Sequence, residues 1–363
     1  MKIVVYAICK NEEKFASRWA TNMGEADEIV VLDTGSTDNT VEILKSFKKV
    51  KLYKQIITPW RFDVARNLSL SYVPEDADIC ICTDLDECFL PNWRKNLEQY
   101  WQKNTTIANY KYVWNHEKNG KDGITFNIEK IHSRYGYHWI NPVHEILQKN
   151  NNLIENKIHI PNICLHHYAD DTKSRSSYLP LLELAVNENP LNDRNIHYLG
   201  REYMFYGKYE KSIKTLKRHL KLKTATWQDE RCASLRYIAK CYMSLNKYNM
   251  ALKYYKLACI EAPYLREPKL ELAELYYFKH KYSDALIMLN SLLQINNRSL
   301  NYISMPKCWN EYPYDLASIC YYNLKQYDNA YIFACHALKI NNSDERIKQN
   351  AEIFYNLAKS TKK

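Results

Sequence analysis

Short apolar runs alternate with amphipathic stretches through the first half of the chain. The apolar runs lack helical spacing, whereas the stretches between them repeat with the period of a helix. The runs are residues 3–8, 28–32, 50–53 and 79–82, and the helical stretches are residues 14–23, 40–47 and 64–72. Strands that alternate with helices of this length predict βαβ units on a parallel sheet.

The pattern changes after Trp101. Two longer runs, residues 107–115 and 124–133, alternate apolar and polar positions, and turn residues at 119–123 separate them. This arrangement predicts a β-hairpin added to the sheet.

A third pattern begins near residue 174, where strand signals end and a repeat starts. In the copy that begins at Cys232, the pattern places Leu235, Ile238, Ala239, Tyr242, Ala251, Tyr255, Ala258 and Pro263 at positions 4, 7, 8, 11, 20, 24, 27 and 32. Similar offsets recur in units that start near residues 193, 266 and 311. Small residues are needed where the two helices of a unit approach closely, and the offsets are those of the tetratricopeptide repeat.

These patterns predict two domains, an α/β domain over residues 1–172 and an all-α repeat solenoid over residues 173–363. The units are spaced by 39, 34 and 45 residues, so the first and third connections carry insertions. The concave face of such a solenoid commonly binds a partner chain. The alternative is an appendage that forms a dimer.

Charge divides the chain at the same place. The first 172 residues carry 21 Lys and Arg against 23 Asp and Glu, whereas the remainder carries 30 against 18. A nucleic-acid partner would suit this basic half, but no recognised nucleic-acid motif is present and the charges alternate as on solvated faces. The basic excess favours an acidic segment of a partner instead.

The cysteine pattern and the hydropathy of the chain indicate in which cellular compartment the protein works. The eleven cysteines are scattered without a Cys-x-x-Cys pair, which predicts reduced, buried side chains. No apolar run approaches the ~20 residues of a membrane span, and the first apolar stretch is too short for a secretory signal. We expect a cytoplasmic protein.

Two polar clusters follow predicted strands, where a parallel sheet presents its ligand site. Asp33 opens the sequence DTGSTDNT and could accept a hydrogen bond from a base or a ribose, although the same residues also suit an ordinary turn that caps the next helix. Asp84, Asp86 and Glu87 place three carboxylates within four residues. Such a cluster suits Mg²⁺ or Mn²⁺, and the alternative is an acidic loop before the helix near residue 91.

Further candidates come from helix starts and later strand ends. Arg66, in the sequence WRFDVARN, could bind phosphate or hold Asp84 from behind. His144-Glu145 follows Asn141-Pro142, and His166-His167 ends the run at residues 158–165. Their positions favour metal ligation or acid–base chemistry over filler histidines.

Six short sequences occur in one order along the chain. They are KNEE at residues 10–13, DTGSTDNT at 33–40, WRFDVARN at 60–67, DLDE at 84–87, VHE at 143–145 and HHY at 166–168. In this order they resemble family 2 glycosyltransferases with a GT-A fold. The chain is most similar to members that carry C-terminal tetratricopeptide repeats, a group that includes peptide S-glycosyltransferases of the glycocin type.

The resemblance implies a UDP-sugar donor and assigns residues to its pocket. Asp33 would contact the uracil, and Asp63 and Arg66 would shape the same pocket. Asp84 would contact the ribose or the sugar. UDP-glucose and UDP-N-acetylglucosamine are the expected donors.

It also implies a divalent ion, Mn²⁺ or Mg²⁺, that Asp86 and His167 hold on the diphosphate. Glu145 matches the catalytic base of inverting members, although the family motif usually ends in Glu-Asp and Ile146 follows here. The implied reaction is a direct displacement with inversion, in which Glu145 takes the proton of a hydroxyl or thiol.

Three hypotheses follow. The first is a metal-dependent transferase that moves a hexose or N-acetylhexosamine from a UDP-sugar to a Ser, Thr or Cys side chain of a protein or peptide presented by the repeats. The second keeps the chemistry but assigns a glycan or lipid-linked acceptor, with the repeats forming a homodimer. The third, a scaffold that only binds the nucleotide-sugar, is disfavoured because Asp84, Asp86, Glu145 and His167 are all present.

Overall fold

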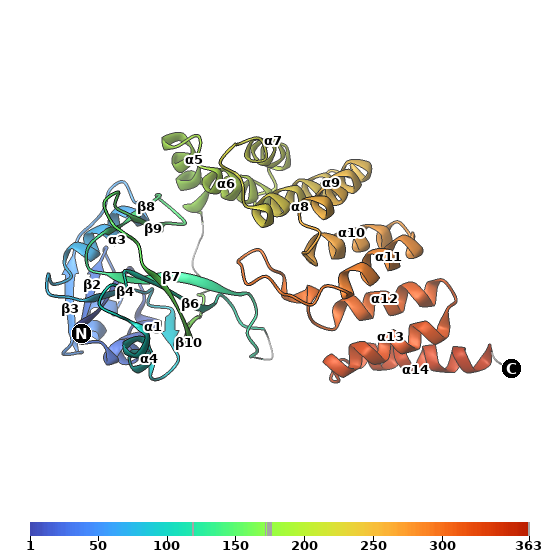
Figure 1. The fold of residues 1–363 in the computed structure, drawn as a ribbon, viewed down its shortest axis with the longest axis horizontal. Coiled ribbons are helices and arrows are strands. Elements are labelled where there is room, and N and C mark those ends of the chain that lie inside the picture. The colour runs from blue at the N-terminus through green and yellow to red at the C-terminus, as the bar shows by residue number, and fades with distance from the viewer. Residues whose placement is uncertain (118–119, 171, 173–175, 362–363) are drawn as a thin grey trace. The chain divides into compact units, whose positions relative to one another are not determined.

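The computed structural model describes residues 1–117, 120–170, 172 and 176–361, and its ribbon is shown in Figure 1. The chain divides into two compact units, Met1–Glu188 with Leu300–Tyr302 and Asn189–Ser299 with Ile303–Lys363. The sequence-predicted boundary at residues 172 and 173 falls within the first unit, which continues through helix α5 (Tyr178–Glu188). Residue 173 itself lies outside the described residues.

The first unit is built on an eight-stranded mixed sheet. Its strand order is β3-β2-β1-β4-β7-β6-β10-β5, and β8 and β9 form a separate hairpin. The strands are β1 (Ile3–Cys9), β2 (Glu28–Asp33), β3 (Val50–Lys54), β4 (Ile79–Cys82), β5 (Glu87–Phe89), β6 (Ile107–Val113), β7 (Thr125–Ser133), β8 (Tyr137–Ile140), β9 (Ile146–Lys149) and β10 (Lys157–His167). Strands β3, β2, β1 and β4 run parallel, which confirms the βαβ prediction.

Helices cover both faces of the parallel strands. Val5 in β1 packs in one core with residues of α1 (Glu13–Asn22), α2 (Thr40–Lys45) and α4 (Trp93–Tyr100). Its neighbours Val4 and Tyr6 belong to the opposite core with residues of α3 (Phe62–Ser71). Because side chains alternate between the faces of a strand, a run without polar positions is what a doubly covered strand requires.

The predicted hairpin is also confirmed. Strands β6 and β7 pair antiparallel, and β7 joins the parallel strands through β4. Residue 119, where the turn was expected to begin, lies outside the described residues. Strand β10 pairs parallel with β6 and antiparallel with β5, so its last residues lie beside the acidic segment that leads into β5.

Four helix pairs and a final helix make up most of the second unit. They are α6 (Asp193–Phe205) with α7 (Tyr209–His219), α8 (Gln228–Ser244) with α9 (Tyr248–Glu261), α10 (Glu267–Phe278) with α11 (Tyr282–Leu293), α12 (Tyr312–Asn323) with α13 (Tyr327–Ile340), and α14 (Glu345–Ser360). A short 3₁₀ turn, η2 (Pro306–Cys308), lies in the connection before α12. This arrangement of helical hairpins is the tetratricopeptide architecture.

The turn inside each pair has the same geometry. Its second residue has a positive φ, at Gly207 (69°), Asn246 (57°), His280 (56°) and Lys325 (61°). The next residue donates its N–H to the carbonyl of a tyrosine five residues earlier, at Tyr203, Tyr242, Tyr276 and Tyr321. This hydrogen bond closes each first helix in the manner of a Schellman cap.

Small residues occur where the paired helices touch. A Cβ placed on Gly200 would lie 2.5 Å from side-chain atoms of Leu216 on α7. The corresponding positions of the later repeats are Ala239, Ala273 and Ser318, all with no exposed surface. The repeat register read from the sequence therefore has its basis in close helix packing.

Two further sequence expectations concern cysteines and membranes. All eleven cysteines are free, eight of them buried and three half-buried. Within the described part of the chain, none of the helices combines the length and the apolar character needed to cross a bilayer.

Candidate active site

Two loops interlock at the carboxyl ends of β1 and β2. The N–H of Glu12 donates to Oγ1 of Thr40 over 2.7 Å, and the N–H of Asn39 donates to the Glu13 carboxylate over 3.0 Å. The KNEE and DTGSTDNT sequences, 23 residues apart by their first positions, are therefore one structural element.

Asp33 lies in this element at the end of β2. Its carboxylate is buried and accepts the N–H of Ser36 over 3.1 Å, and Gly35 between them has a φ of 108°. Only a residue without a Cβ adopts that conformation easily. The sequence DTGSTDNT therefore forms the predicted turn. The same turn places Asp33 at the strand end, where a ligand would bind.

The acidic segment after β4 contains two cations supplied by the protein. Arg66 on α3 donates to Asp84 over 2.8 Å, and the Lys130 ammonium on β7 lies 3.1 Å from Asp84 and 2.8 Å from Glu87. Glu87 is fully buried and also accepts the hydroxyl of Tyr112 over 2.8 Å. Of the two roles predicted for Arg66, holding Asp84 from behind is the one observed.

These ion pairs set the charges of the segment. Burial by itself would raise the pKa of Asp84, but the Arg66 and Lys130 charges hold it well below its ordinary value. Burial raises the pKa of Glu87, against the opposing effect of Lys130. Mutual repulsion of the carboxylates is therefore relieved by side chains, so repulsion alone does not call for a metal ion.

The third carboxylate, Asp86, has a different environment. Its Oδ2 lies 3.2 Å from Nε2 of His167, and the other ring nitrogen of His167 contacts the carbonyl of Trp114 over 2.8 Å. Among the described residues, Oδ1 of Asp86 is buried without a hydrogen-bond partner. An oxygen and an imidazole nitrogen placed in this way fit a divalent cation, and the Trp114 carbonyl orients the ring for it.

Glu145 lies just before β9 in the loop that joins β8 and β9. Its Oε1 accepts a short hydrogen bond from Nε of Arg66, so Arg66 holds Asp84 and Glu145 together. The guanidinium also lies 5.2 Å from the ring of Trp139. Glu145 and Asp84, 61 positions apart in the sequence, are thereby brought to one place.

Asp63 belongs to another cluster. Arg61 binds its carboxylate with two hydrogen bonds of 3.0 and 2.9 Å, and Arg61 also pairs with Glu188 at the end of α5. The resemblance groups Asp63 with Arg66, but the ion pairs of the two residues are separate.

The adjacent histidines at the end of β10 also separate. While His167 faces Asp86, His166 contacts Nε2 of His116 through its Nδ1 over 3.0 Å. Asp122 lies in the same group, close enough for the three side chains to share an ion. Neighbouring residues of a strand point to opposite faces, which accounts for the divergence.

Lys130 is the site residue that the sequence reasoning missed. It lies in β7 two residues before the buried His132, whereas a register shift between β6 and β7 lets Ile128 pack with Ile131 in the other core. A lysine in line with buried positions of a strand needs an acidic partner, since a buried unpaired ammonium is very costly. That spacing was the available signal.

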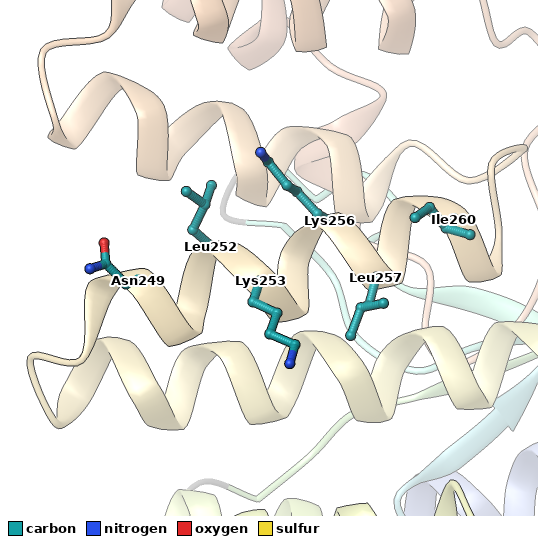
Figure 2. Close-up of a pocket in the computed structure, with 6 residues that line it drawn as sticks. All are labelled: Asn249, Leu252, Lys253, Lys256, Leu257 and Ile260. Atoms are coloured by element: carbon teal, nitrogen blue, oxygen red, sulfur yellow. The ribbon is translucent and has the colours of Figure 1, made fainter.

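The second unit carries a shallow depression along α9. Its lining combines aliphatic and lysine side chains, as Figure 2 shows: Asn249, Leu252, Lys253, Lys256, Leu257 and Ile260. Ile260 has 75% of its surface exposed. None of the predicted catalytic or metal-binding residues lies there.

The first unit combines a mixed sheet, an acidic segment after β4, Glu145 in the β8–β9 loop and His167 at the end of β10. This arrangement is that of a GT-A-type sugar transferase domain. Residues 5–161 match the family model described as Glycosyl transferase family 2. The first domain belongs to that family, and the protein is a glycosyltransferase with C-terminal tetratricopeptide repeats.

Solved structures with similar helical repeats share little sequence with this chain. A crystal structure of MamA protein has 15% identity, covers 45% of this chain and 81% of its own, and has a TM-score of 0.37. A tetratricopeptide repeat protein from Parabacteroides merdae has 19% identity, coverage of 50% and 66%, and a TM-score of 0.39. A thermophilic TPR protein of Thermus thermophilus has 16% identity, coverage of 49% and 88%, and a TM-score of 0.35.

Proposed function

We propose that the protein is a metal-dependent, inverting transferase that moves a hexose or N-acetylhexosamine from a UDP-sugar to a protein or peptide side chain. The observation that carries this proposal is the division of labour within the acidic segment. Arg66 and Lys130 form ion pairs with Asp84 and Glu87. Asp86 instead places Oδ2 3.2 Å from His167, and its Oδ1 is buried without a hydrogen-bond partner among the described residues. One carboxylate is thus reserved for a cation.

Asp86 and His167 would hold Mn²⁺ or Mg²⁺. When bound, the ion supplies positive charge that stabilises the departing diphosphate. The protein side chains do the remaining work. Asp33 and Asp63, both buried, provide acceptors for the uracil and the pocket around it, and Asp84 provides one for the ribose or the sugar.

Glu145 is the proposed base. The acceptor oxygen or sulfur bonds to the anomeric carbon as the bond from that carbon to the diphosphate oxygen breaks. UDP leaves with the bonding electrons, and Glu145 takes the proton of the acceptor. The hydrogen bond from Arg66 fixes the position of the Glu145 carboxylate. A thiol acceptor needs less help, since its ordinary pKa is about 8.5.

The repeat domain would select the acceptor. Residues 173–363 carry 30 Lys and Arg against 18 Asp and Glu, and α9 presents Lys253 and Lys256 beside exposed Leu257 and Ile260. Such a surface suits an acidic peptide with apolar side chains. We propose that the protein works in the cytoplasm.

The donor is tested first. The full-length protein is incubated with Mn²⁺ and a panel of UDP-sugars, and UDP release is measured by mass spectrometry. Turnover of one UDP-sugar that stops with chelator is expected. A donor that turns over equally well without any divalent ion would refute the metal-dependent reaction.

The acceptor is tested by charge reversal on the repeats. Lys253→Glu with Lys256→Glu should raise the acceptor KM and leave donor hydrolysis unchanged. Lys221→Glu with Lys223→Glu is the matched control, since these lysines are also exposed on the repeat unit. Equal KM values in the two double variants would show that α9 does not bind the acceptor and would favour a glycan or lipid-linked acceptor with repeats that form a dimer.

A further inference from the structure

Three consecutive helices of the repeat unit bring a buried polar cluster together. His197 lies on α6, His219 on α7 and Glu230 on α8, three helices that follow one another along the solenoid (Figure 1). The two histidines have no exposed surface and Glu230 has 4%. One nitrogen from each histidine and one oxygen of Glu230 all lie within 4.8 Å of one another.

The nitrogens of this cluster are incompletely satisfied. Nε2 of His197 and Nε2 of His219 are both buried without a hydrogen-bond partner in the described ranges of the chain. Nε2 of His219 lies 3.3 Å from Oε1 of Glu230, but the two atoms lack the alignment of a hydrogen bond. Zn–N and Zn–O bonds of about 2.0–2.2 Å at a tetrahedral angle separate two ligand atoms by about 3.3 Å. The observed spacing is therefore that of two ligands on one ion.

Ser234 on α8 contacts the other nitrogen, Nδ1, of both rings, and this contact supports the same interpretation. Its Oγ lies 2.8 Å from Nδ1 of His197 and 2.9 Å from Nδ1 of His219. A hydroxyl oxygen can accept two hydrogen bonds, so both Nδ1–H groups can donate to it at once. Each ring then presents the lone pair of its Nε2 toward the cluster. An outer partner that fixes the tautomer in this way is typical of metal-binding histidines.

Glu230 is the residue whose charge favours a cation at this site. The guanidinium groups of Arg194 and Arg201 act on His197 electrostatically and oppose a cation, whereas Glu230 favours one. Two imidazole nitrogens and one carboxylate oxygen are a ligand set that suits zinc. We propose that His197, His219 and Glu230 bind one Zn²⁺ ion that joins α6, α7 and α8 and stabilises the start of the solenoid, separately from the ion of the transferase site.

The test is the zinc content of the full-length protein. An Asp86→Asn, His116→Gln background removes the other candidate sites, and the protein is prepared from zinc-supplemented cultures and dialysed. Elemental analysis should find about one zinc per chain in this background. Adding His197→Gln or Glu230→Gln should remove it, and Ser234→Ala should weaken zinc affinity about 10–100-fold. His336→Gln, a histidine of α13 outside the cluster, is the control and should keep the metal.

A second measurement covers variants that fold poorly. Glu230→Gln preserves the shape of the side chain, and circular dichroism establishes that it is helical. Zinc should raise the Tm of the background protein and leave that of Glu230→Gln unchanged. Equal zinc contents, equal Tm shifts or no bound zinc in either protein would overturn the proposal. These readouts do not depend on glycosyl transfer.

Discussion

Replacing Lys130 by Met would measure how much the buried ion pairs contribute to the stability of the first unit. The change keeps the length of the side chain but removes the ammonium that lies 2.8 Å from Glu87, whose side chain is 1% exposed. Removing one partner of a buried ion pair costs about 3–5 kcal/mol, because the other charge stays buried without compensation. For a unit of this size, that corresponds to a Tm lower by about 6–20 °C.

The loss should depend on pH in a defined direction. The pKa of Glu87 is already raised in the folded protein, chiefly by burial, and the loss of Lys130 raises it further. A carboxyl whose pKa is higher in the folded than in the unfolded state contributes stability at low pH that is lost as the pH rises through the folded pKa. The difference between the variant and the wild type should therefore be smaller at pH 5 than at pH 8.

Calorimetry of the full-length protein at both pH values measures these effects. Lys157→Met is the matched control, since Lys157 pairs with Glu129 over 2.9 Å on the exposed surface, with side chains 41% and 39% exposed. Such a pair is worth at most about 1 kcal/mol. Adding Glu87→Gln to Lys130→Met should recover part of the lost stability. Equal Tm losses in Lys130→Met and Lys157→Met, or a larger deficit at pH 5, would refute the reasoning.

Three other substitutions test the site and the repeats. Asp86→Asn should abolish the metal-dependent UDP release while calorimetry shows a folded protein, and full release by this variant in chelator would remove Asp86 from the metal site. Glu145→Gln should keep UDP-sugar affinity and lower transfer about 10²–10⁴-fold, and transfer at the wild-type rate would place the base elsewhere. Gly200→Ala should destabilise the repeats by about 1–3 kcal/mol through overpacking against Leu216, and an unchanged Tm would contradict that packing.

Most of the fold could be predicted from the sequence because each element leaves a pattern within a short segment of the chain. The parallel strands are continuous apolar runs such as residues 3–9, since helices cover both of their faces. The repeats are readable because close packing demands a small residue at one offset. Strand β5 was missed, because its three residues, Glu87–Phe89, are too few for a period to appear and Glu87 was assigned to an acidic loop.

The site was accessible only in part, because its contacts join distant segments. Asp84 and Asp86 could be placed at a strand end by their position after β4. The contact of Arg66 with Asp84 was one of its two predicted roles. That Arg66 also binds Glu145, and that the partner of Lys130 is Glu87, depends on pairings of α3, β7 and the β8–β9 loop that no local pattern encodes. Local patterns predict where chemistry-bearing residues lie, and the topology determines which of them meet.

The turns within the helix pairs have a constant length, whereas the connections between pairs vary in length. Within each helix pair the turn has three residues, because the left-handed residue and its hydrogen bond allow one closure. The connections between pairs have no such constraint and take up the insertions, and each doubling of a loop costs only about 0.6 kcal/mol. The longest, residues 294–311, is nevertheless fixed. Arg266 donates to the carbonyls of Ile295 and Cys308 and lies 3.9 Å from the ring of Trp309. One buried guanidinium thus orders the long connection as the left-handed cap orders the short turns.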